Sequence, residues 1–136
     1  MEAKKSPPFY LRARRLWLSL GWMLILLVVF LSLASNPIEV LPVAAGDKLG
    51  HVLAYGVLMV WFANLYETSA KRRMFAIGFV AMGIALEFVQ GWSGYRAFEL
   101  ADMVADAIGV AAGWVFAPPR IPNVLRSIEK TVLHTL

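Results

Sequence analysis

The chain has no cysteine among its 136 residues, and only 16% of those residues are charged. The lack of cysteine excludes disulfide bonds, thiolate metal sites and cysteine nucleophiles. An ordinary globular domain is about half apolar and about a quarter charged, whereas 60% of this chain is hydrophobic. Histidine, which most often changes charge near neutral pH, occurs twice, at His51 and His134. The composition therefore indicates an integral membrane protein with one domain, residues 1–136.

Four apolar segments follow a short N-terminal arm, at about residues 16–35, 49–66, 74–90 and 101–117. A helix needs roughly 20 apolar residues to cross a hydrocarbon layer of about 30 Å. Prolines at positions 118 and 119 end the last segment. The tail, residues 118–136, has apolar residues at helical spacing, which is typical of a helix lying on a membrane surface. The sequence predicts an all-α protein: a four-transmembrane-helix bundle with an amphipathic interfacial C-terminal helix.

The positive charges predict the direction of the spans. Eleven of the 13 Lys and Arg residues fall in the N-terminal arm, the second loop and the tail. By the positive-inside rule, both termini lie in the cytoplasm. The net charge of +4 would otherwise suggest nucleic acid, but these cations flank apolar segments. We therefore expect the lipid bilayer as a partner and no nucleic acid.

The acids collect at the opposite ends of the spans. Six of the nine lie in the predicted outer half: Glu39, Asp47, Glu87, Glu99, Asp102 and Asp106. A bilayer tolerates such groups when they pair, line water or serve a function. Residues 47, 51 and 55 are four apart and share one face of the second helix, while residues 99, 102 and 106 share a face of the fourth. This pattern predicts one outward-facing polar pocket.

Two sets of side chains are candidates for the chemistry of this pocket. The candidate catalytic residues are His51, Glu87, Asp102 and Asp106. The candidate binding residues are Asp47, Lys48, Tyr55, Gln90, Arg96 and Glu99. Glu87 or His51 would act as general base, with the two aspartates orienting it. We expect Asp106 and Glu87 to be the buried acids, because each lies about one turn inside its helix.

Arg96 is the expected counter-ion of these acids, with Lys48 second, and both would attract a phosphate or carboxylate. A mixed shell of histidine and carboxylates could hold Zn²⁺ or Mn²⁺. The sequence has no HExxH motif, no strict metal-ligand spacing and no GxSxG motif, so no metal ligands are assigned and the cofactor is left open. A structural ion-pair network around Arg96 is an alternative explanation of the same acids. Gly109 and Gly113 form a small-xxx-small spacing that favours close helix packing, or a homo-oligomer through these two glycines.

The ordered set of polar residues resembles the VanZ-like family of small membrane proteins. The resemblance rests on Asp47-Lys48-x-x-His51-x-x-x-Tyr55, on Glu87-x-x-Gln90 with Arg96, and on Glu99-x-x-Asp102-x-x-x-Asp106-x-x-Gly109-x-x-x-Gly113. These motifs cover residues 47 to 113, about half of the chain. The family more often has Asn where this chain has Asp106, so the second carboxylate is a departure from its pattern. The namesake is associated with resistance to the glycopeptide teicoplanin.

The resemblance implies a multi-pass protein of the bacterial cytoplasmic (inner) membrane. With the pocket, it predicts an envelope protein that binds or modifies a polar or lipid-linked molecule and influences tolerance to glycopeptide antibiotics. Whether the protein is an enzyme is left open. Two other functions fit the residues: a small proton- or cation-coupled transporter, and a non-catalytic partner subunit of a membrane complex. The transporter is the weaker of these, because the inner half of every span is almost free of ionisable groups.

Overall fold

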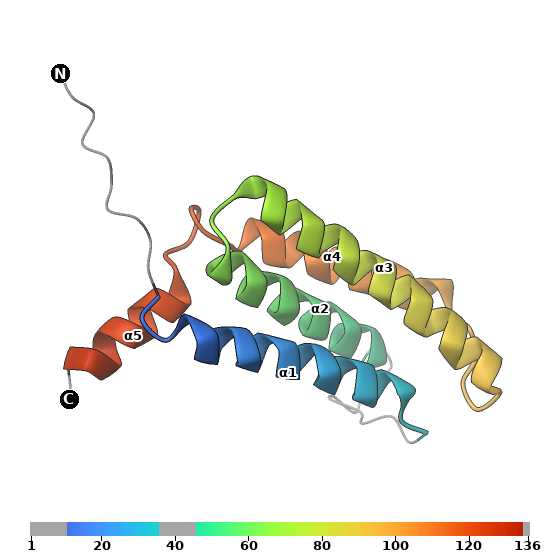
Figure 1. The fold of residues 1–136 in the computed structure, drawn as a ribbon. Helices are drawn as coiled ribbons and strands as arrows, with labels where there is room; N and C mark the ends of the chain where they lie inside the picture. The colour runs from blue at the N-terminus through green and yellow to red at the C-terminus, as the bar shows by residue number, and fades with distance from the viewer. Residues whose placement is uncertain (1–10, 36–45, 135–136) are drawn as a thin grey trace.

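The computed structural model describes residues 11–35 and 46–134, and over that part of the chain it contains helices and no strand. The helices are α1 (Arg14–Leu33), α2 (Gly46–Leu65), α3 (Ser69–Ser93), α4 (Leu100–Val115) and α5 (Val124–His134). Figure 1 shows α1 to α4 running side by side, with α5 set across the end at which α1 begins. The prediction of an all-α protein is confirmed for these residues.

Three of the helices, α1, α2 and α3, are long and apolar enough to cross a membrane. α4 has 16 residues, slightly fewer than the roughly 17–25 usual for a span. α3 begins five residues before the predicted 74, because the Thr68 side chain accepts a hydrogen bond from the Lys71 backbone N–H and caps the helix. α2 begins three residues before the predicted 49. The earlier start places Asp47 and Lys48 in its first turn.

α2 packs closely against α4 through glycines. A Cβ atom added at Gly109 would lie 2.5 Å from the backbone oxygen of Val52, and one at Gly113 would lie 2.6 Å from the backbone oxygen of Gly56. No larger residue fits at these distances, so the predicted close packing is confirmed. The contact joins two helices of one chain and aligns the first turns of α2 and α4. A homo-oligomer through Gly109 and Gly113 stays a prediction.

α1 is held at its C-terminal end by side chains from α3 and the loop after it. Its surface is largely apolar and exposed, with Leu26 67% and Phe30 69% accessible. The last carbonyl groups of a helix have no partner within the helix. Gln90 donates to the Ser32 carbonyl at 2.6 Å, and Tyr95 donates to the Leu33 carbonyl at 2.7 Å. These bonds keep the end of α1 beside the polar residues of α2.

The other end of α1 is capped by Glu129 of α5. The helix has no side-chain cap of its own at Ala13. The Glu129 carboxylate accepts hydrogen bonds from the backbone N–H groups of Arg12 and Ala13, each at 2.9 Å, and from the Trp17 indole at 2.7 Å. Burial alone would raise the pKa of Glu129, but the bonds from Ala13, Trp17 and Arg12 outweigh it and lower the pKa below its usual value. α5 is thereby fixed under the start of α1.

Candidate functional site

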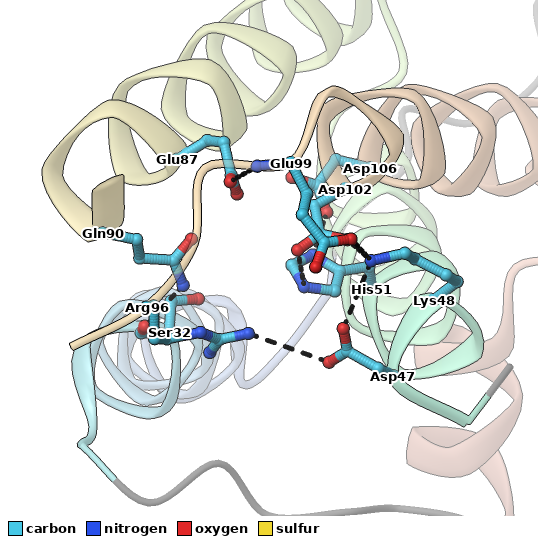
Figure 2. A network of polar contacts seen from close by, with 10 residues as sticks. All are labelled: Ser32, Asp47, Lys48, His51, Glu87, Gln90, Arg96, Glu99, Asp102 and Asp106. Carbon is cyan, nitrogen blue, oxygen red and sulfur yellow. Dashed lines mark hydrogen bonds and ion pairs between the residues drawn. The ribbon is translucent and has the colours of Figure 1, made fainter. Parts of the chain in front are cut away.

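Lys48 is the centre of an ion-pair network between the first turns of α2 and α4. Its ammonium group donates to Glu99 at 2.5 Å, to Asp47 at 3.3 Å and to Asp102. The Asp102 side chain is only 3% exposed, whereas those of Asp47 and Glu99 are 49% exposed. A buried carboxylate needs a partner of this kind, because an unpaired charge in an apolar medium is strongly unfavourable. Figure 2 shows the three carboxylates surrounding the lysine.

His51 lies one turn after Asp47 on α2, and its ring stands between two carboxylates of α4. Its Nδ1 atom is 2.8 Å from Oδ1 of Asp106, and its Nε2 atom is 3.4 Å from Oδ2 of Asp102. The His51 side chain is 15% exposed, so one side of the ring remains accessible. The four-residue spacing of Asp102 and Asp106 places both acids on the same face of α4. An imidazole held in this way can accept or donate a proton in a fixed orientation.

A cavity of about 180 Å³ opens beside His51, between α1, α2 and the loop that carries Arg96. Its polar lining includes Asp47, His51 and Arg96, and its apolar lining includes Val28 and Leu31 of α1. The Arg96 guanidinium lies 3.8 Å from Asp47, and its side chain is 16% exposed. The lining of the cavity therefore combines an arginine and a histidine with apolar side chains of α1.

Tyr55, one turn beyond His51, also lines this cavity and is buried to 2% exposure. Asp47, His51 and Tyr55 thus share one face of α2, as their spacing predicts. α1 is a wall of the site that the sequence did not indicate. Val28, Leu31 and Ser32 belong to an apolar segment without charges, and nothing in their pattern distinguishes a cavity wall from a lipid-facing surface.

Glu87 is buried but lies outside the Lys48 and His51 network. Its carboxylate accepts a hydrogen bond at 2.5 Å from the backbone N–H of Glu99, the residue that precedes α4. Figure 2 shows the Glu87 carboxylate turned toward the backbone nitrogen of Glu99. Its observed interaction fixes the start of α4, and this position does not favour the predicted role of general base. Gln90 likewise faces α1, where it bonds Ser32.

One expectation about the electrostatics needs correction. Lys48, and not Arg96, is the main counter-ion among the described residues, because Lys48 contacts three carboxylates while Arg96 approaches Asp47. Arg96 lies in a loop on the α1 side of the site, whereas Lys48 lies between α2 and α4. The expected burial of Asp106 and Glu87 is confirmed, and Asp102 is equally buried: as whole residues, Asp102 and Glu87 are 2% exposed and Asp106 is 3% exposed. α2 covers the first turn of α4, so depth along the helix does not decide burial.

Comparison with models of known protein families gives no match, and comparison with solved structures gives none. The chain is similar to an uncharacterized protein of Schizosaccharomyces pombe, with 32% identity over 89 residues. The matched stretch covers 63% of this chain and 54% of that relative. The chain therefore spans about half the length of the curated relative that it matches. Its function has to be argued from the site itself.

Proposed function

We propose that the chain is an integral membrane protein of the cell envelope whose cavity beside His51 binds the polar head group of a lipid-linked molecule. In this proposal the protein belongs to the VanZ-like family and lies in the bacterial cytoplasmic membrane. α1 to α4 are its four spans, and both termini are cytoplasmic. The polar ends of α2 and α4 then face outward, and α5 lies on the cytoplasmic surface with Val124, Ile128 and Val132 exposed toward lipid.

The observation that carries this proposal is the mixed lining of the cavity. Arg96 and His51 share this lining with apolar residues of α1, a helix whose outer surface is itself apolar and exposed. A cavity of about 180 Å³ is small beside the roughly 300–1,000 Å³ of pockets for drug-sized ligands. It therefore suits a head group better than a whole lipid. The acyl chains of such a ligand would stay in the bilayer along α1.

The side chains of the cavity also indicate how the head group is held. A guanidinium binds phosphate or carboxylate oxygens in a bidentate manner. Within the part of the chain that the structure describes, Arg96 has one carboxylate contact, with Asp47 at 3.8 Å. Lys48 is occupied by three carboxylates, so Arg96 is the cation that meets an anionic ligand. His51, oriented by Asp106, adds a polar ring to the same lining.

Native mass spectrometry of the protein extracted from membranes in mild detergent tests this binding. The wild type is expected to retain a polar lipid, and Arg96→Gln and His51→Gln are expected to lose it at unchanged abundance and unfolding temperature. Glu67→Gln, which changes an exposed acid between α2 and α3, serves as the control and should retain the lipid. Equal retention by all four proteins would exclude binding in this cavity.

Antibiotic tolerance gives a test in cells. Teicoplanin tolerance is followed together with protein abundance for Asp102→Ala, Glu87→Ala and His51→Ala. Lost tolerance at normal abundance is expected for His51→Ala, because this residue lines the cavity. Lost abundance in all three variants would instead favour the purely structural ion-pair network.

A further inference from the structure

Three side chains beside the cavity each offer an atom that ligates metals. These side chains belong to Asp47, His51 and Asp102, and their ligating atoms all lie within 4.8 Å of one another. We infer that they bind one divalent transition-metal ion of the Zn²⁺ or Mn²⁺ kind, with a coordination position open to the cavity. The inference rests on the proposed function, because it takes the same cavity as the place where the ligand binds.

The separation between His51 and Asp102 fits two ligands of one tetrahedral ion. Nε2 and Oδ2 are 3.4 Å apart, longer than the usual N–H···O distance of about 2.7–3.2 Å. Zinc binds histidine nitrogen and carboxylate oxygen at about 2.0–2.2 Å, and two such ligands in a tetrahedron are separated by about 3.4 Å. The other Asp102 oxygen, Oδ1, is held by Lys48. Oδ2 is therefore the oxygen that remains for an ion.

Asp106 gives His51 the support that a metal-binding histidine usually has. Such a histidine commonly donates a hydrogen bond from its second ring nitrogen to a carboxylate. This bond fixes the orientation of the ring and increases its basicity as a ligand. The Nδ1 atom of His51 makes this contact with Asp106 at 2.8 Å. Nε2 then points toward Asp102 and is the ring nitrogen that an ion would meet.

The balance of charge also calls for a further cation. Among the described residues, four carboxylates and two permanent cations, Lys48 and Arg96, take part in the contacts around His51. When all four carboxylates are ionised, two negative charges are uncompensated. Two of these carboxylates, Asp102 and Asp106, are buried, where an uncompensated charge is unfavourable. One divalent ion would neutralise the two charges. A histidine nitrogen combined with carboxylate oxygens suits Zn²⁺ or Mn²⁺.

The third ligand and the open position complete the geometry. Asp47 is 49% exposed and lies at the start of α2, so its side chain can turn toward the ion without disturbing the core. Asp47 and His51 both line the cavity. Three protein ligands with a fourth position free for water or substrate are typical of catalytic rather than structural zinc sites. A phosphate or carboxylate of the head group could take that position beside Arg96.

The test is titration of purified, EDTA-treated protein in detergent with Zn²⁺ alone and with Mn²⁺ alone, followed by calorimetry and elemental analysis. The wild type is expected to bind one ion per chain and to unfold at a higher temperature when loaded. Asp47→Asn, which changes an exposed side chain and should fold, is expected to bind the ion about 10-fold or more weakly. Asp106→Asn should weaken binding by about 10–100-fold, as loss of a carboxylate behind a ligand does.

Matched controls are Glu67→Gln, an acid at the other end of α2, and His134→Ala, the second histidine of the chain. Both should bind the ion like the wild type. No stoichiometric binding of either ion, or equal binding by wild type and Asp47→Asn, would overturn the inference. A lipid retained equally before and after EDTA treatment would overturn the role of the metal in ligand binding and leave the proposed function standing. Stoichiometric metal in a protein that retains no lipid would reject the proposed function alone.

Discussion

The Nδ1 atom of His51 lies 2.8 Å from Oδ1 of Asp106, one turn deeper in α4 than Asp102. A carboxylate at this distance accepts a hydrogen bond from the ring N–H, so the neutral histidine should carry its proton on Nδ1. Asn at position 106 keeps an acceptor oxygen, whereas Leu does not. The pairing thus connects the residue that lines the cavity to a buried side chain that sets its orientation.

Nitrogen NMR of the imidazole ring in detergent tests this pairing, with His134→Ala as the background so that one histidine remains. We expect the Nδ1–H form of His51 in this background and also with Asp106→Asn. Asp106→Leu should shift the ring toward the Nε2–H form that predominates in free histidine. The same ratio of the two His51 tautomers with Asp, Asn and Leu at position 106 would contradict the assigned contact.

Removing the cation at position 48 should destabilise the protein. Lys48→Met leaves buried Asp102 without its main counter-ion. Removing one partner of a fully buried pair costs about 3–5 kcal/mol. Because the Lys48 side chain is 32% exposed, solvent screening reduces the expected loss of unfolding free energy to about 1–3 kcal/mol. Unfolding monitored by tryptophan fluorescence measures it.

Lys48→Arg keeps the charge and should lose less stability than Lys48→Met. Adding Asp102→Asn to Lys48→Met removes the orphaned charge and should recover part of the loss, which a double-mutant cycle quantifies. Additive effects of the two substitutions would mean that Lys48 and Asp102 do not interact.

The sequence predicts the long helices and the polar residues that share a helix face, because both depend on regular spacing. Apolar length identifies the long helices, and the four-residue steps from Asp47 to His51 and from Asp102 to Asp106 place these side chains on common faces. A pattern of this kind reports which residues share a face of one helix. It does not report which side chain of another helix they meet. Lys48 as the centre of the network is therefore visible only once α2 and α4 are packed.

The same limit applies to the surroundings of Glu87 and to the choice of metal ligands. Glu87 lies at the same depth along the helices as the other polar residues, but its partner is the backbone N–H of Glu99. A contact with a backbone group cannot be predicted from residue types. The inferred metal ligands come from two helices separated by about fifty residues of chain, so they form no short motif. The contacts at both ends of α1 are equally long-range: Gln90 reaches Ser32, and Glu129 reaches Ala13.

Alanine at the glycines between α2 and α4 should destabilise the bundle. A Cβ at Gly113 would lie 2.6 Å from the Gly56 oxygen and 2.7 Å from the Met59 Cβ, so the helices must separate. Overpacking of this kind costs about 1–3 kcal/mol. Gly78→Ala is the matched control on α3, since a Cβ there meets nothing within 4 Å. This control should be neutral or slightly stabilising because Ala favours helix by up to about 1 kcal/mol over Gly.

Unfolding temperature in detergent separates these variants. Gly113→Ala should melt well below the wild type and Gly78→Ala at or above it. The two variants melting together would show that the close approach of α2 and α4 does not limit stability.

The attachment of α5 should depend on pH through Glu129. Its folded-state pKa is lowered, so its contribution to stability is present above the pKa of the unfolded chain and is lost as pH falls through the lower folded value. We expect α5 to detach from the start of α1 only under acid conditions and to stay docked at neutral pH.

Glu129→Gln should weaken docking at neutral pH by about 1–3 kcal/mol, because charge-assisted hydrogen bonds are lost. Trp17 fluorescence should report the detachment of α5, since the Trp17 indole donates to the Glu129 carboxylate. A Trp17 signal in Glu129→Gln that still changes across the same acid range would assign the transition to another group.

The proposed direction of the spans can be tested with introduced cysteines, because the chain has none of its own. Ala70 is exposed beside the Lys71, Arg72 and Arg73 cluster, and Trp92 is 92% exposed at the other end of α3. With both termini cytoplasmic, Trp92→Cys should react with a membrane-impermeant maleimide added to intact cells. Ala70→Cys should react only after the membrane is opened, and its full labelling in lysed cells serves as the reactivity control.

The reverse pattern would place the His51 cavity on the cytoplasmic side and exclude a head group presented from outside. Labelling of both positions in intact cells would mean that α3 does not span the bilayer.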